Sequence, residues 1–225
     1  STTIPAPVRF IGDLHCNGNL TGALGSYCNG KVSATGTVLW WGGGPPTAVQ
    51  WTAPAYTGPA GTLSKYQNYT IKGQDFTAYT SFTANTMRSA DAVALNAIDM
   101  SATNPGRIIV AKSGNYTIEE NMDLTGTLLV NGRLDVRNAG PHIIRAVDGF
   151  PALVVSGDIK FQDAGATLTV IGSVICNGIV DLNSKSGASL VVTGSLILAS
   201  GFSSTRGDTP VQLNWDTNRS TFWDV

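Results

Sequence analysis

A nine-residue frame recurs along this chain, with apolar residues at positions one, three, seven and nine and glycine at position five. Four copies occupy residues 128–136, 153–161, 168–176 and 190–198, and a fifth occupies residues 8–16. Because successive side chains of a β-strand point to opposite faces, the odd positions of each frame all point the same way. The repeat therefore predicts short strands that share one apolar core.

The central glycines of the four later copies fall 25, 15 and 22 residues apart. This uneven spacing is typical of stacked coils that share strands but differ in their turns, and one coil alone buries too little apolar surface to be stable. We predict an all-β fold, a right-handed parallel β-helix (β-solenoid) with an aromatic-rich insertion and one short helix. The alternative is an antiparallel sandwich with glycine-rich hairpins. It is less favoured because a sandwich has no need to repeat one frame.

The copy at residues 8–16 implies that both ends of the chain belong to one solenoid, interrupted by a long insertion. We predict a single domain over residues 1–225, with the solenoid at 8–38 and 115–205, the insertion at 39–114 and a C-terminal cap at 206–225. Within the insertion, apolar residues at mixed spacings of three and four predict one helix over residues 86–100. The glycine of each frame is expected to mark a corner or a close approach between coils.

Residues 39–82 hold nine of the chain's 18 aromatic residues and three of its charged ones. Exposed rings can stack on sugar faces, so one hypothesis is a ligand-binding patch for polysaccharide. Its candidate residues are Trp40, Trp41, Trp51 and Tyr56. The favoured alternative is that the insertion covers one face of the solenoid as a second small core.

Such a cover is needed because the last two repeats place apolar residues at outward positions, where they would otherwise be exposed. Either the insertion or a neighbouring subunit must bury them. The C-terminal aromatic residues could cap the last coil or dock into a neighbour. The candidate subunit-interface residues are therefore Ile171, Ile175, Val191, Ile197, Trp215, Phe222 and Trp223.

No set of catalytic residues emerges from the sequence. The outward positions that follow the repeat glycines form no ladder of carboxylates, since they read Asp13, Arg133, Asp158, Ser173 and Ser195. Asp158, Asp163 and Asp181 could meet in space, but aspartates in turns more often stabilise the turn itself. His15 and His142 lie in unrelated contexts. We therefore predict no catalytic residue, no metal site and no cofactor.

Charge, cysteine content and hydropathy narrow the partners, cross-links and membrane attachments that the chain can have. A net charge of −1, with 14 scattered basic residues, disfavours a nucleic-acid partner. Cys16, Cys28 and Cys176 are too few for a disulfide framework. A bridge between Cys16 and Cys28 is possible, and buried free thiols are favoured. No apolar stretch is long enough to span a membrane, so we expect membrane attachment only through a segment that this sequence lacks.

The repeats resemble those of bacterial β-helix surface proteins and, more loosely, bactofilins, whose solenoids use G-x-[ILV] repeats and polymerise end to end. The Ser- and Thr-rich start is also similar to that of pilin-like or pilus-associated proteins. The chain departs from both groups, since bactofilins lack an aromatic insertion of this size and the hallmark pilin helix is absent. The resemblance covers residues 8–38 and 115–200 and implies architecture more than role.

These observations predict a non-enzymatic structural or adhesive component of a cell-surface filament or appendage, extracellular or on the cell surface. It would assemble through its solenoid with copies of itself or with other surface-structure subunits. The alternative is a carbohydrate-binding or polysaccharide-cleaving β-helix protein. A third class, an intracellular scaffold polymer, is disfavoured by the low charge and the aromatic richness.

Overall fold

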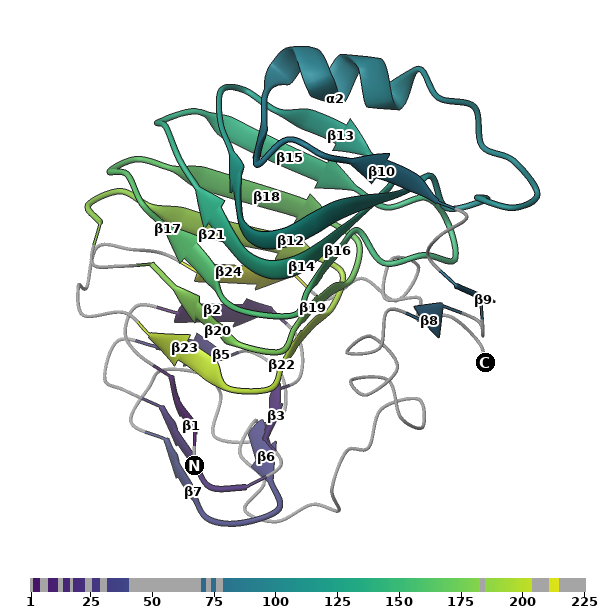
Figure 1. Ribbon diagram of the computed structural model, residues 1–225. Helices are drawn as coiled ribbons and strands as arrows, with labels where there is room; N and C mark the ends of the chain where they lie inside the picture. Colours follow the sequence, from purple (N-terminus) through teal and green to yellow (C-terminus); the bar gives the residue numbers. More distant parts are fainter. Residues whose placement is uncertain are drawn as a thin grey trace.

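The computed structural model describes residues 2–4, 8–11, 14–16, 18–22, 26–28, 32–40, 70–71, 74–75, 79–182, 185–203 and 211–214. In this part of the chain the strands stack into a parallel β-solenoid of about seven turns with a single short helix (Figure 1). The predicted β-solenoid is therefore confirmed, and the alternative of an antiparallel sandwich is wrong.

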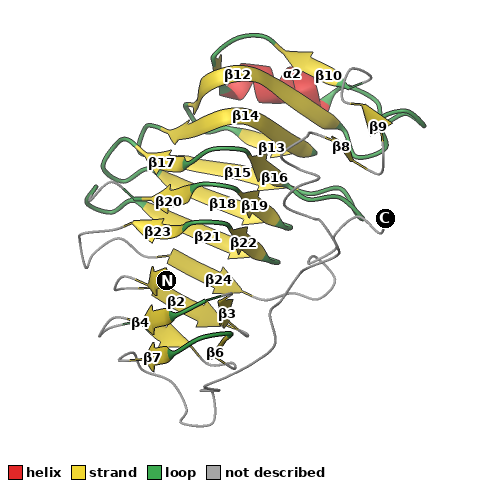
Figure 2. Ribbon diagram, turned by 60° about the horizontal axis from the view of Figure 1, so that its bottom comes forward, coloured by secondary structure: helices red, strands yellow, loops and turns green. Residues whose placement is uncertain are grey.

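The solenoid has three faces, and strands of successive turns stack in parallel on each face (Figure 2). The β16 face contains the first halves of β12 (Ile108–Ile118) and β14 (Thr127–Val136), then β16 (Leu153–Val155), β19 (Val174–Cys176), β22 (Leu196–Leu198), β3 (Leu14–Cys16) and β6 (Val32–Ala34). The β17 face contains the second halves of β12 and β14, then β17 (Ile159–Phe161), β20 (Ile179–Asp181), β23 (Gly201–Ser203), β1 (Thr2–Ile4), β4 (Leu20–Gly22) and β7 (Val38–Trp40). The β18 face contains β13 (Asp123–Thr125), β15 (Pro141–Arg145), β18 (Thr167–Ile171), β21 (Ser189–Thr193), β24 (Val211–Asn214), β2 (Val8–Ile11) and β5 (Tyr27–Cys28).

The core is a column of inward side chains that the parallel registers align coil on coil. On the β16 face, one such row runs Ile109, Leu128, Leu153, Val174 and Leu196. The alternation predicted from the repeat therefore holds, because every second residue of a strand faces this column. The row members from Ile109 to Val174 are fully buried.

The repeat glycines lie at two different corners of the solenoid, not at one. The frames at 128–136 and 153–161 turn the corner from the β16 face to the β17 face, where the Gly157 N–H donates to the Gly132 carbonyl at 2.8 Å. The frames at 168–176 and 190–198 turn the corner from the β18 face to the β16 face. The spacing of 15 residues between two of the glycines thus separates two corners and is not the length of a coil.

The difference between corners corrects one expectation about side-chain direction. Ser173 and Ser195, expected to point outward, are buried, and the Ser195 hydroxyl donates to the Ser173 hydroxyl at 2.8 Å. Arg133 and Asp158 follow the glycines of the other corner and do lie on the outside. The same nine-residue frame therefore carries different side-chain environments at the two corners.

The stack begins earlier than residue 115, where we predicted the solenoid to resume. Strand β12 starts at Ile108 and pairs with β14 over its whole length, with a register shift between Ala111 and Gly114. One extra residue at this bulge hides a further copy of the repeat frame from the sequence pattern. Two short strands, β10 (Thr80–Phe82) and β11 (Thr86–Met87), pair with the other edge of β12. A separate pair, β8 (Thr70–Ile71) and β9 (Gln74–Asp75), is antiparallel.

Helix α2 (Ser89–Asn96) closes one end of the stack and is shorter than the predicted helix over 86–100. It starts later because Thr86 and Met87 form β11 instead. Ala92 and Leu95 are buried beneath the helix. Asp91 lies in its first turn and accepts a hydrogen bond from the Arg88 N–H at 2.9 Å, which satisfies a backbone donor at the helix start.

Two asparagine side chains complete the strand edges at the helix-capped end. The Asn96 amide donates to the Asp123 carbonyl and accepts from the Thr125 N–H, both at 2.8 Å, so it takes the place of a neighbouring strand beside β13. Asn104 does the same for the first residue of β12, accepting from the Ile108 N–H at 2.6 Å and donating to its carbonyl at 3.1 Å. Protected strand edges resist unwanted pairing with other chains.

Changing Asn96 to aspartate should lower the free energy of unfolding by about 2 kcal/mol, because a carboxylate oxygen would face the Asp123 carbonyl in place of a donor. Urea unfolding at neutral pH measures this loss. The matched control is Asn115→Asp, the same isosteric change at an exposed position on the outside of β12, which should shift the value by less than about 0.5 kcal/mol. Equal effects of the two changes would contradict the edge-completing role of Asn96.

Candidate functional site

The candidate ligand-binding aromatics fall mostly outside the described residues. Trp40 is the last residue of β7, and its side chain is not described; Trp41, Trp51 and Tyr56 lie outside the described part. The same holds for the C-terminal candidates Trp215, Phe222 and Trp223. The sugar-stacking hypothesis for these rings stays a prediction.

The outward apolar residues of the β16 face form a ladder that is covered within the chain. Its five rungs align in register, one from each of five consecutive turns, namely Val110, Leu129, Val154, Ile175 and Ile197. The middle rungs are almost fully buried, and the ladder packs with Tyr79 and Phe150 in a second apolar cluster.

This arrangement corrects the proposed role of Ile175. Its side chain has no exposed surface in the single chain, so it is not available to a neighbouring subunit. Ile197 at the end of the ladder is only partly buried and still reaches the surface. Of the two covers left open by the sequence, the insertion or a neighbouring subunit, contacts within the chain account for the middle of the ladder, and Tyr79 of the predicted insertion is among them.

Ile171 and Val191 lie on a different face from Ile175 and Ile197. They are outward residues of the neighbouring strands β18 and β21 on the β18 face, and both are half-buried. The four residues were expected to share one surface, because the repeat frames were aligned as if they turned one corner. The structure separates them into two pairs on two faces.

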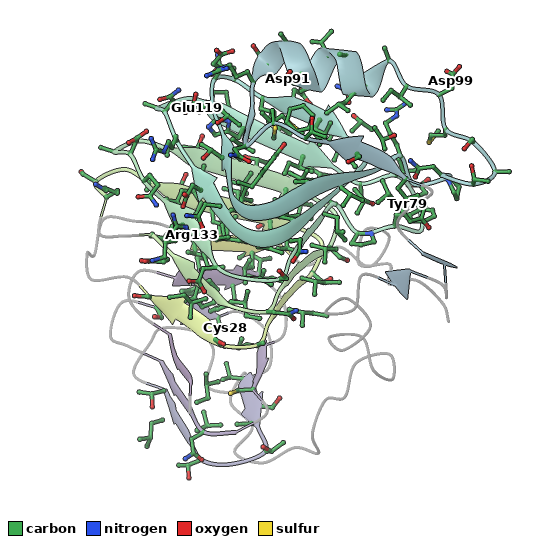
Figure 3. All side chains as sticks on the ribbon, in the orientation of Figure 1. Cys28, Tyr79, Asp91, Asp99, Glu119 and Arg133 are labelled. Atoms are coloured by element: carbon green, nitrogen blue, oxygen red, sulfur yellow. The ribbon has the colours of Figure 1, made fainter. Side chains whose placement is uncertain are left out.

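The β17 face carries a group of charged side chains that pair with one another. Arg133, labelled in Figure 3, lies 2.8 Å from Asp135, which also accepts a hydrogen bond from the Gln162 amide at 2.8 Å. On the next two strands Lys160 lies 3.6 Å from Asp181. The pairing stabilises each charge beside an opposite one and leaves no isolated group poised for proton transfer among these five residues.

The three aspartates considered as a catalytic group have separate structural roles. Asp158 accepts the Ile179 N–H of the next turn at 3.0 Å, and Asp163 accepts the Asn138 N–H at 2.8 Å. Asp181 pairs with Lys160. Each carboxylate thus stabilises a turn or a strand, as its sequence context predicts.

His142 is a buried polar residue in the solenoid core. It points inward from β15, in register with Leu168 and Leu190, and its Nε2 donates to the Arg137 carbonyl at 2.6 Å. Its Nδ1 has no hydrogen-bond partner in the described part of the chain. Burial lowers the pKa of this imidazole, and the backbone carbonyls of Arg137 and Asn138 offset part of that decrease. The neutral ring is therefore the form that the fold accommodates.

The lowered pKa of His142 predicts acid sensitivity. Above about pH 6.5 the ring is neutral in both folded and unfolded chains, and below it the unfolded chain binds the proton more readily. The free energy of unfolding should therefore fall as the pH drops from 6.5 toward 5, by at most about 1.4 kcal/mol per pH unit. Denaturant unfolding at both pH values measures the fall.

His142→Leu supplies the comparison, because leucine matches Leu168 and Leu190, the next two residues of this row, and does not titrate. This variant should lose stability at pH 7.5, since the Arg137 carbonyl loses its donor, and should show a smaller decrease between pH 6.5 and 5. An unchanged pH dependence in the variant would assign the acid effect to other groups.

The cysteines are free thiols in the structure. Cys16 is in β3 and Cys28 in β5, on different faces, and no bridge joins them. The favoured prediction of buried free thiols holds for Cys28 and Cys176, whereas Cys16 is a free thiol that is only partly buried. Burial raises the pKa of the Cys176 thiol to about 12. Among the described residues no group of histidine, cysteine or acidic side chains could hold a metal ion.

The exposed large apolar side chains of the described residues lie only in the two end regions of the stack. Leu39 is in β7 at one end and is 49% exposed, while Val93 of α2 and Met100 just after it, at the other end, are 69% and 52% exposed. Figure 1 shows α2 and β7 at opposite ends. The middle turns present no such side chain in the described part.

No family model, curated protein or solved structure matches this chain. No helix within the described residues has the length and apolar composition needed to cross a membrane. The functional proposal therefore depends on the geometry of the solenoid.

Proposed function

We propose that this protein is a non-enzymatic structural or adhesive component of a cell-surface filament or appendage, and that it assembles through its solenoid. The observation that carries the proposal is the placement of the exposed apolar residues Leu39, Val93 and Met100 in the two end regions of the stack. Exposed apolar side chains that gather in particular regions mark contact surfaces, and contacts between unlike ends generate open linear assemblies.

The polar chemistry of the sides agrees with a structural role. The charges of the β17 face pair with one another, and Asp158 and Asp163 hold backbone N–H groups. These groups keep successive turns in register instead of converging around a substrate. Such a solenoid supplies a stiff column whose length follows from the number of stacked turns.

The purified chain should form oligomers or filaments in light scattering and negative-stain electron microscopy across a concentration series. Val93→Asp and Leu39→Asp should each lower the apparent molar mass by placing a charge in an end region. Ala164→Asp is the matched control, because Ala164 is exposed in a turn between β17 and β18, and this change should leave assembly intact. A monomer at every concentration, or equal loss of assembly in all three variants, would overturn the proposal.

A further inference from the structure

Strands from near the two ends of the sequence pair with each other inside the stack. On the β18 face, β24 lies between β21 and β2, and all four residues of β24 pair in parallel with Val8–Ile11 of β2. We call strands β1 to β7, residues 2–40, the N-terminal unit. It continues the solenoid beyond the C-terminal strand, although the two segments lie far apart in the sequence (Figures 1 and 2).

The junction between β24 and the N-terminal unit is built like the rest of the core. Phe10 points inward from β2, is almost fully buried, and lies in register with Leu213 of β24 and then Val192 of β21. Strand β1 lies beside β23 on the β17 face. The unit's own strands pair with one another in parallel, β2 with β5, β3 with β6, and β4 with β7.

The connection that leaves the N-terminal unit is long compared with the stack. Residues 41–78 join β7, at one end of the stack, to Tyr79 and β10 at the helix-capped end. A chain of 38 residues can reach about 125 Å when extended. About seven turns spaced ~4.8 Å apart measure only ~34 Å. The covalent link therefore permits the N-terminal unit to reach a different molecule.

We propose that the N-terminal unit docks on β24 of a second copy of this chain, so that subunits join by exchanging it. The exchanged junction would contain the same backbone pairing and the same Phe10 packing as the junction within one chain. Each chain offers one N-terminal unit and one β24 edge, so successive exchanges give an open line of subunits or a closed ring. This inference rests on the proposed function, since it names the partner and the joint.

The balance between docking within one chain and docking between two chains depends on protein concentration. A unit that is covalently tethered to its own docking edge meets that edge at an effective concentration on the order of millimolar. Docking within the chain therefore dominates in dilute solution, and exchange becomes favourable when chains fold side by side at high local concentration. Strand addition of this kind derives its affinity from main-chain hydrogen bonds, which do not distinguish one copy from another.

A disulfide between cysteines placed on β2 and β24 shows whether these two paired strands come from the same chain or from two chains. Arg9 and Gln212 are exposed register partners on β2 and β24, and adjacent strands ~4.8 Å apart lie within the Cα distance range that a disulfide spans. The Arg9→Cys/Gln212→Cys variant, which also carries Cys16→Ser to remove a partly exposed native thiol, is unfolded under reducing conditions. It is then refolded at low and at high protein concentration and oxidised.

We expect internally cross-linked monomer at low concentration, and disulfide-linked dimers and larger species at high concentration, on non-reducing gels. Cross-links found only within single chains at every concentration would overturn the inference. If this variant fails to regain its β-sheet circular dichroism, the pair Ile11→Cys/Asn214→Cys makes the same test at the next outward register position.

The matched control is Thr169→Cys/Val191→Cys, with Cys16→Ser as well. These register partners lie on β18 and β21, within consecutive turns that no exchange at β24 separates. The control should remain internally cross-linked at all concentrations. If it also gives intermolecular products, the cross-links between chains come from aggregation, and the inference of exchange is overturned. Light scattering of the unmodified chain tests the proposed function separately. A strict monomer would overturn the proposed assembly, whereas the cross-links formed on refolding decide whether the N-terminal unit is exchanged between chains.

Discussion

Replacing Gly132 by alanine should destabilise the solenoid by about 4 kcal/mol or more, enough to unfold many domains of this size. Gly132 adopts a φ of +142°, which a residue with a side chain rarely adopts. A Cβ at this position would also collide with the carbonyl oxygen of Gly114 in the turn above. Because that oxygen belongs to the backbone of a paired strand, it cannot move away without breaking the ladder. Urea unfolding followed by circular dichroism measures the loss.

Gly114→Ala separates the backbone conformation from the collision. Gly114 lies at the same corner with a similar φ of +116°, but no atom lies within 4 Å of the position that its Cβ would occupy. Its replacement should cost only the strain of the backbone conformation, on the order of 1–2 kcal/mol. Losses of equal size in the two variants would mean that close stacking of the turns contributes nothing at Gly132.

The glycines show how far the sequence predicts this fold. The period of two and the repeated frame were sufficient to predict stacked parallel strands and an inward apolar column, because both follow from strand geometry. They were also sufficient to predict that glycine marks a corner or a close approach between coils, and Gly132 does both. They did not predict that Gly132 and Gly172 lie at different corners, since both are surrounded by the same alternation of apolar residues.

Other features were missed because their signals are not periodic. The bulge between Ala111 and Gly114 breaks the frame of β12, so the pattern does not reveal a strand that pairs along its full length with β14. The amides of Asn96 and Asn104 complete strand edges through tertiary contacts that no local motif announces. The meeting of β2 with β24 is likewise a matter of topology, although the copy of the frame at residues 8–16 indicates that the first residues belong to the solenoid.

The separation of the candidate interface residues onto two faces has a consequence for experiments on assembly. Ile175 was paired with Ile171 and Val191 on sequence grounds, yet only Ile171 and Val191 retain exposed surface. A substitution at Ile175 that abolishes assembly would do so by unfolding the subunit. Assembly variants belong instead in the end regions and at the junction between β2 and β24.

Ile175→Asp should therefore lower the free energy of unfolding by about 4 kcal/mol or more. The new carboxylate would be buried beside Val154 and Ile197 of the adjoining strands, beneath the cluster that includes Tyr79 and Phe150. A charge that is removed from water without a partner is among the costliest changes a core can receive. Thermal or urea unfolding of the monomeric fraction measures the effect, and poor recovery of folded protein is the expected outcome if the loss exceeds the total stability.

Val191→Asp tests the same change on the β18 face, where the side chain is only partly buried between Thr169 and Gln212. Water still reaches this position, so the loss should stay below about 1.5 kcal/mol. A folded, stable Ile175→Asp monomer that no longer assembles would mean that the ladder of the β16 face is an interface between subunits and not an internal second core. The large difference expected between the two variants follows mainly from burial, because both changes replace a β-branched apolar residue of a strand with the same carboxylate.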